Sequence, residues 1–304
     1  MRGKRGFTLI ELVVVVAILG FLFTILAGIT RALMSQQRYQ VTRARLSNIE
    51  SAMVVYVTQS KRLPCPANGR LASSDSNAGK EVVTGTGTAR DCGTQQHGVV
   101  PWRELGLTAS DIEDGWGGRL TYRVGPDLAK DGALDFTSCD PAGSAAVPGT
   151  TPPYCNTACS ATTLTTQCTP PSTALGPAVA KGLVVENASG GVIMDPRGTN
   201  PASIPSLSTG AAYVVISHGP EGGGAYSSEG VLLSSSVTAG TKEALNFANL
   251  AYSAPSNPVT SAPPSYLVDD VLNGTSTTSH FDDIVLRPGI LTLATKANLG
   301  ARTH

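Results

Sequence analysis

A long apolar segment near the start of the chain constrains the fold more than any other feature. From Phe7 to Thr30 the single formally charged side chain is Glu11. A helix of this length extends ~35 Å, enough to cross a hydrocarbon core of ~30 Å. A secretory signal peptide would have a shorter apolar core followed by a small-residue cleavage site. The sequence therefore predicts a membrane-spanning helix over residues 7–30.

Residues 1–6 read as a short leader. The leader carries Arg2, Lys4 and Arg5, and basic residues favour the cytoplasmic side of a membrane. We therefore expect the start of the chain to stay in the cytoplasm and the rest to lie beyond the membrane. Basic residues also follow the apolar segment, among them Arg31 and Arg38, so the charge asymmetry is only partial.

Glu11 requires a partner, because a carboxylate in lipid costs a few kcal/mol on insertion scales. Cutting the chain after Gly6 would release a cationic α-amine on Phe7, one helical turn from Glu11. In a stack of identical subunits, Glu11 of one copy could pair with the Phe7 amine of its neighbour, so that neither charge is buried alone.

The stretch Gly6-Phe7-Thr8-Leu9-Ile10-Glu11-Leu12 resembles the cleavage and methylation motif of type IV prepilins and type II secretion pseudopilins. The resemblance implies cleavage between Gly6 and Phe7 by a prepilin peptidase, methylation of the new amine and assembly into a helical filament. Glu11 matches the assembly carboxylate of that motif. Where many pilins carry a helix-breaking proline, this chain has Gly28, which weakens a helix by about 1 kcal/mol relative to alanine.

Residues 31–62 continue the helix with an amphipathic pattern. Leu46, Ile49, Met53 and Val57 recur at steps of three and four residues and form one apolar stripe. The run Leu63-Pro64-Cys65-Pro66 ends the helix, because proline cannot donate a backbone hydrogen bond and disfavours helix in the residue before it. A head of residues 63–304 follows.

The head reads mainly as short strands separated by loops rich in Gly, Pro, Ser and Thr. A Gly-rich turn at 114–118 leads into a strand with alternating faces at 119–124, and a hairpin is predicted from residues 182–186 and 191–194. Further strands are predicted at 211–217, 231–233, 283–286 and 290–293. The expected fold class is α+β, pilin-like: a long N-terminal helix packed on a mainly antiparallel sheet.

Cysteine usage indicates an oxidising compartment. The chain has six cysteines, an even count beyond a membrane segment that favours disulfides. Cys65 and Cys92 form a natural early pair. The other four, whose connectivity stays open, are Cys139, Cys155, Cys159 and Cys168; they lie in a Cys-, Pro- and Thr-rich insertion at about 137–177. Their spacing includes one C-x3-C but no second tight pair, so a zinc site is the weaker interpretation.

Two tryptophan-containing stretches, at 101–107 and 114–117, resemble, together with residues 63–67, a subgroup of large pilin-like proteins. There these stretches fasten the loop after the helix onto the sheet. The plainer interpretation is that Trp102 and Trp116 are core anchors, since large aromatic side chains dominate protein cores.

The stretch after the strand at 211–217 offers two candidate sites. Ser217 and His218 invite comparison with a serine hydrolase, but neighbouring residues of a strand point to opposite faces and no nucleophile elbow surrounds them. Some pseudopilins bind Ca²⁺ in a Gly- and acid-rich loop after a strand, and the resemblance makes candidate ligands of Glu221, Glu229, Asp282 and Asp283. The competing interpretation of these acids is a solvated turn and a strand-edge pair.

The function predicted is that of a non-enzymatic subunit, a minor one, of a type IV pilus or type II secretion pseudopilus. Its expected partners are other subunits, the prepilin peptidase and the inner membrane, with the head in the periplasm; no cofactor is expected other than the Ca²⁺ just considered. The formal net charge is zero, which gives no reason to expect a nucleic-acid partner. The alternative is a membrane-anchored periplasmic binding or adhesive protein that does not polymerise.

Overall fold

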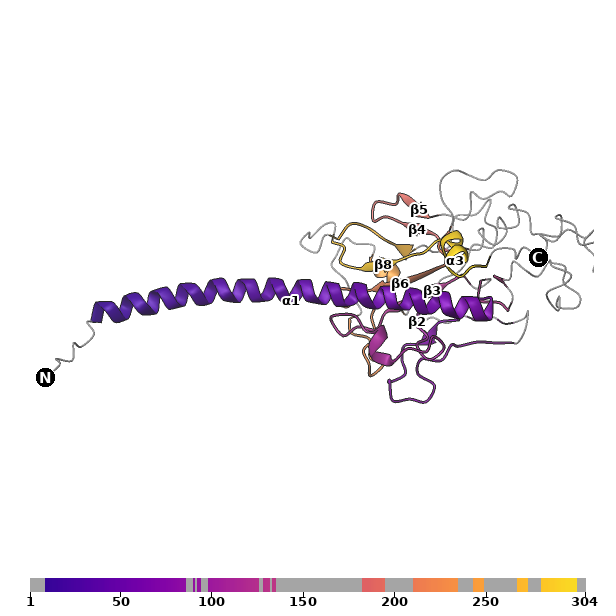
Figure 1. Cartoon of the computed structure of the whole chain (residues 1–304), viewed down its shortest axis with the longest axis horizontal. Coiled ribbons are helices and arrows are strands. Elements are labelled where there is room, and N and C mark those ends of the chain that lie inside the picture. Colours follow the sequence, from indigo (N-terminus) through magenta and orange to yellow (C-terminus); the bar gives the residue numbers. More distant parts are fainter. Residues whose placement is uncertain are drawn as a thin grey trace, which may run out of the picture.

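Helix α1 (Leu9–Ser60) runs for 52 residues and sets the shape of the molecule. In Figure 1 its N-terminal half projects from the head as a rod, and its C-terminal half lies across the head. The computed structural model describes residues 9–85, 90, 92–93, 98–125, 128–131, 133–134, 182–194, 210–234, 243–248, 267–272 and 280–299. The helix passes Gly20 and Gly28 without interruption. The long N-terminal helix of the predicted fold is therefore confirmed.

The end of α1 follows from its local sequence. Lys61 adopts a left-handed conformation, with φ 54°, and its N–H donates to the carbonyl of Val57 at 2.9 Å. A left-handed residue directly after a helix is a common stop. Pro64 then prevents the chain from resuming the helix.

The C-terminal half of α1 packs on the head through the stripe predicted from the sequence. Leu46, Ile49, Met53 and Val57 are all buried, three of them completely. They join one hydrophobic core with strand residues such as Tyr122. Burying a side chain of this size stabilises the fold by about 1.5–3 kcal/mol, so this stripe is a major attachment of helix to head.

The main sheet has five strands in the order β1-β2-β3-β6-β8, and every neighbouring pair is antiparallel. The central pair is in register from Thr121 opposite Ile216 to Val124 opposite Tyr213. The strands are β1 (Ala67–Asn68), β2 (Gly98–Val99), β3 (Thr121–Val124), β6 (Tyr213–Ser217) and β8 (Ile284–Leu286). The predicted α+β class with a mainly antiparallel sheet is confirmed.

A second sheet of three strands has the order β5-β4-β7. The predicted hairpin is confirmed, since β4 (Val185–Glu186) and β5 (Val192–Met194) pair antiparallel. The third strand, β7 (Leu267–Val268), pairs with β4 in parallel and was not predicted.

Strand β6 is buried on both faces because it separates two cores. Tyr213 and Val215 belong to the core beneath α1, whereas Val214 and Ile216 belong to a second cluster with residues of the small sheet. Strand β3 also has the predicted alternation, but its polar face is buried too: Arg123 donates to the carbonyl oxygens of residues 247 and 248.

Two of the predicted strands are wrong. Residues 290–293 begin a helix, α3 (Ile290–Lys296), which follows Gly289. Its buried positions, Ile290, Leu293 and Ala294, are spaced three and four apart, and the apolar run alone did not distinguish that helical period from a strand. Residues 231–233 form isolated bridges, such as Tyr226 with Leu232, instead of a strand ladder. Among the described residues there are also two short 3₁₀ helices, η2 (Ala109–Ile112) and η7 (Glu243–Asn246).

Candidate functional site

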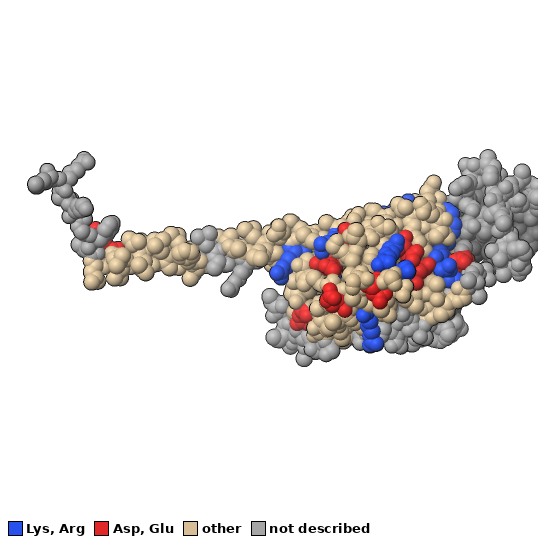
Figure 2. All heavy atoms as spheres, turned by 90° about the horizontal axis from the view of Figure 1, so that it is seen from below, with Lys and Arg blue, Asp and Glu red and all other residues tan. Residues whose placement is uncertain are grey.

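The N-terminal half of α1 lies outside the head. By length and composition α1 suits a membrane crossing, and its most apolar 18-residue window has a mean hydropathy of 3.0 with no residue buried against the described part of the chain. Large side chains such as Phe21 and Phe23 are about 70% exposed, at 68% and 71%. Figure 2 shows this half as an almost uncharged rod, with charged side chains gathering where the head begins. Such a surface requires lipid or other apolar helices around it.

Glu11 lies in the first turn of α1 and is exposed. A carboxylate at this end is favoured by the helix dipole. Gly6 and Phe7, the predicted cleavage and methylation residues, lie outside the described residues. In a helix, Glu11 is about one turn from residue 7, so the position suits the pairing with a neighbour's amine that the sequence suggests.

The head contacts α1 through the turn at residues 114–118. The N–H of Gly115 donates to the hydroxyl of Thr42 at 2.9 Å, and Arg45 donates to the carbonyl oxygens of residues 113 and 114. A Cβ on Gly115 would stand 2.5 Å from the carbonyl oxygen of Arg38, far inside contact distance. Glycine is thus required for this backbone-to-backbone contact. The ring of Trp116 meets Tyr39 of α1 edge-on, with centroids 4.9 Å apart.

Asp114 organises that turn from within. Its Oδ1 accepts hydrogen bonds from the backbone N–H groups of Trp116 and Gly118, both at 2.9 Å. Its Oδ2 accepts one from the hydroxyl of Ser217, at the end of β6. Burial raises the pKa of Asp114 above its ordinary value, although these hydrogen bonds act to lower it.

Ser217 and His218 do not form a nucleophile–base pair in the structure. The Ser217 hydroxyl donates to Asp114 at 2.8 Å, while Nε2 of His218 lies 2.7 Å from the hydroxyl of Thr121. Both residues are almost completely buried, with 0% and 1% exposed. Their roles in this arrangement are structural, holding β6 to its neighbours.

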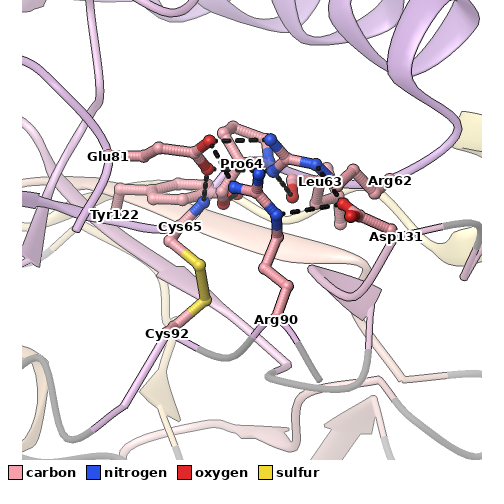
Figure 3. Close-up of a disulfide and its surroundings, with 9 residues drawn as sticks. All are labelled: Arg62, Leu63, Pro64, Cys65, Glu81, Arg90, Cys92, Tyr122 and Asp131. Atoms are coloured by element: carbon pink, nitrogen blue, oxygen red, sulfur yellow. Dashed lines mark hydrogen bonds and ion pairs between the residues drawn. A yellow bond between two sulfur atoms is a disulfide. The ribbon is translucent and has the colours of Figure 1, made fainter. Parts of the chain in front are cut away.

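The loop after α1 is fastened by a disulfide and an ionic cluster (Figure 3). Cys65 and Cys92 are bonded, with their Cα atoms 5.3 Å apart. Arg62 donates to both carboxylate oxygens of Glu81, at 2.7 and 2.9 Å, and Arg90 contacts the same carboxylate at 3.0 Å. The predicted insertion and the cysteines at 139, 155, 159 and 168 lie outside the described residues.

Glu81 connects this cluster to the backbone, since it also accepts a hydrogen bond from the N–H of Cys65. Burial acts to raise the pKa of Glu81, but the hydrogen bond from Arg62, the backbone bond and the two nearby arginines outweigh it, so the pKa lies below its ordinary value. The carboxylate therefore stabilises the fold in its ionised form.

Three of the four predicted calcium ligands come together in the head. Glu221, Asp282 and Asp283 gather with two residues that the sequence interpretation missed, Glu243 and His280. The fourth predicted ligand, Glu229, is exposed in the turn after β6 and is outside this group. For His280 the sequence did offer a local signal, because this histidine stands two positions before an aspartate pair, at 280–283. Nothing in the spacing pointed to Glu243, which η7 brings to the cluster.

Residues 1–27 match the family model described as the prokaryotic N-terminal methylation motif. No curated protein and no solved structure matches the chain. This match therefore concerns the residues before α1 and the first part of α1, and it does not extend to the head.

Proposed function

We propose, on the premise that this chain carries the prepilin-type signal of type IV pilins and pseudopilins, that it is a non-enzymatic minor subunit of such a filament. It is inserted in the inner membrane with its head in the periplasm. A prepilin peptidase cuts it after Gly6 and the new amine on Phe7 is methylated. The mature chain then leaves the membrane and packs into the filament through α1.

One observation carries the proposal: the methylation motif stands at the start of a helix whose N-terminal half has no cover from the head. Lipid covers this apolar surface before assembly. Neighbouring copies of the same kind of helix offer an equally apolar environment afterwards, so transfer between the two costs little hydrophobic free energy.

Glu11 favours the transfer of α1 from lipid into the filament. In the filament core its carboxylate meets the cationic terminus of an adjoining subunit, a contact that a single copy in lipid cannot make. Two charges that are costly alone become acceptable together, and subunits that are one step out of register lose the pair.

A minor position is supported by the bulk of the head. The chain has 304 residues, and its head carries two sheets and a disulfide-fastened loop beside α1. Close helical stacking leaves less room for a head of this size than a filament end does. The choice of a structural subunit over a hydrolase is supported by the partners of Ser217 and His218, which bond to Asp114 and Thr121 and not to each other.

The mature N-terminus tests the proposal directly. The protein is purified from membranes and from sheared filaments, and the N-terminal peptide is identified by mass spectrometry. We expect it to begin at Phe7 with one added methyl group, and Gly6→Glu to leave the leader attached. An intact Met1 or Arg2 in the wild-type protein would instead favour a membrane-anchored periplasmic binding or adhesive protein.

A further inference from the structure

A buried group of acidic side chains and one histidine lies where β6 ends and β8 begins. Glu221 follows β6, Glu243 opens η7, and His280 and Asp282 precede β8. Two sets of three metal-type side chains overlap at Glu243, and within each set the ligand atoms lie within 4.8 Å of one another. Three segments of the chain that are distant in sequence therefore bring metal-type ligand atoms together around Glu243.

His280 provides an independent sign of a ligand. His280 is only 7% exposed, and its Nε2 atom has no hydrogen-bond partner in the described part of the chain. This nitrogen faces oxygen atoms, lying 3.3 Å from Oε1 of Glu221 and 3.5 Å from Oδ2 of Asp282. A buried imidazole nitrogen without a hydrogen bond is costly, and a metal ion would satisfy its lone pair.

Those separations fit ligands arranged around one ion. Zinc–nitrogen and zinc–oxygen bonds of about 2.0–2.2 Å in tetrahedral geometry place neighbouring ligand atoms about 3.3–3.6 Å apart. The nitrogen–oxygen distances of 3.3 and 3.5 Å lie in that interval. Glu221 is the most exposed member, with 28% of its side chain accessible, which provides a path from solvent.

Charge favours a cation at the same point. Glu243, Asp282 and Asp283 are each at most 3% exposed, and neither aspartate contacts a lysine or arginine among the residues described. Burial raises the pKa of Glu243 to about 7 and that of Asp282 to about 6, and mutual repulsion with Asp283 adds to both shifts. A divalent cation would offset this repulsion.

We propose that Glu221, Glu243, His280 and Asp282 bind one divalent first-row transition-metal ion of the zinc type, which cross-links the chain between β6 and β8. Imidazole nitrogen combined with carboxylate oxygen selects such ions, whereas Ca²⁺ takes oxygen ligands. Asp283 supports the site from beside it, since its Oδ2 accepts a hydrogen bond from Asn246. This inference does not depend on cleavage or filament assembly.

Metal titration of the full-length protein in detergent tests the site. The protein carries no polyhistidine tag, is stripped with a chelator and is titrated with Zn²⁺, Co²⁺ and Ca²⁺ in separate calorimetry and thermal-unfolding experiments. We expect one Zn²⁺ per chain, a higher Tm and a weaker or absent response to Ca²⁺. His280→Gln should raise the Kd for zinc at least about tenfold, because even groups outside the ligand sphere cost that much. Glu229→Gln, an acid outside the cluster, should leave it unchanged.

The visible spectrum of the Co²⁺-loaded wild-type protein gives a second readout that does not require any variant to fold. Nitrogen and oxygen ligands give d–d bands without sulfur charge-transfer bands. Sulfur bands would assign the ion to cysteines and overturn the proposal. Stoichiometric binding of Ca²⁺ without Zn²⁺, or no stoichiometric binding of any of the three ions, would overturn it as well.

Discussion

The hydroxyl of Ser217 donates a hydrogen bond to Oδ2 of Asp114 at 2.8 Å, linking the end of β6 to the turn on which α1 rests. The other oxygen of Asp114 holds the backbone of that turn in place. A single buried carboxylate thus transmits the position of β6 to the surface that receives the helix.

Removing Asp114 should therefore loosen the joint between head and helix. We expect Asp114→Ala to lower the free energy of unfolding by about 3 kcal/mol or more, because three donors lose their acceptor in a buried place. Ser217→Ala should cost only about 1 kcal/mol, since it deletes one hydrogen bond. Denaturant unfolding of the full-length protein in detergent measures both. Equal losses for the two variants would contradict the central role given to Asp114.

The assembly role that we propose for Glu11 predicts that a variant at this position separates membrane insertion from incorporation into filaments. Glu11→Gln should reach the membrane in normal amount, because it removes a charge that lipid disfavours. Its incorporation into filaments should fall tenfold or more, which corresponds to the loss of about 1.4 kcal/mol of pairing free energy. Quantitative immunoblotting of membrane and sheared-filament fractions provides the measurement.

The matched control for Glu11 is Glu50, an acid on the same helix. Glu50 pairs with Lys296 at 2.6 Å, and an exposed pair of this kind is worth at most about 1 kcal/mol. Glu50→Gln should assemble normally. Filaments that accept Glu11→Gln as readily as Glu50→Gln would remove the electrostatic role proposed for Glu11.

The ionised Glu81 carboxylate predicts a sensitivity to acid. Because its pKa is lower in the folded protein than in the unfolded chain, its contribution is present above the unfolded pKa of about 4.3 and is lost as the pH falls through the folded value. Glu81→Gln should cost about 3 kcal/mol at pH 7, because Arg62 and Arg90 lose the buried carboxylate that they share and keep only the more exposed Asp131. The difference from wild type should shrink towards pH 3.

Unfolding curves at a series of pH values between 3 and 7 check this expectation. Glu104, an exposed acid, supplies the comparison: Glu104→Gln should change stability little at either end of the range. A gap between wild type and Glu81→Gln that stays constant across the series would show that Glu81 acts through packing and not through its charge.

Local patterns in the sequence predicted much of the fold. The period of Leu46, Ile49, Met53 and Val57 located the buried face of α1, and the β-branched run at 211–217 located β6. Both signals are strong because the elements are long or completely buried. The N-terminal motif was readable for another reason: it combines charge, glycine and apolar length within a few residues.

The missed features depend on contacts between distant residues. The run at 290–293 has the composition of a strand, and it became a helix because Ile290, Leu293 and Ala294 meet the core on one side. Strand β7 is two residues long and exists through its pairing with β4. Glu243 and His280 carry no shared spacing, and only the folded chain brings their side chains together.

The close contact between Gly115 and Arg38 also fixes the rotational position of the head about α1. Backbone presses on backbone there, so the head cannot swivel freely about α1. From Glu11 to Arg38 an ideal helix makes about seven and a half revolutions, which sets the two residues on opposite sides of the rod. Glu11 thus points away from the side of α1 that carries the head, so the direction in which Glu11 points within a bundle of helices sets the direction in which the head projects.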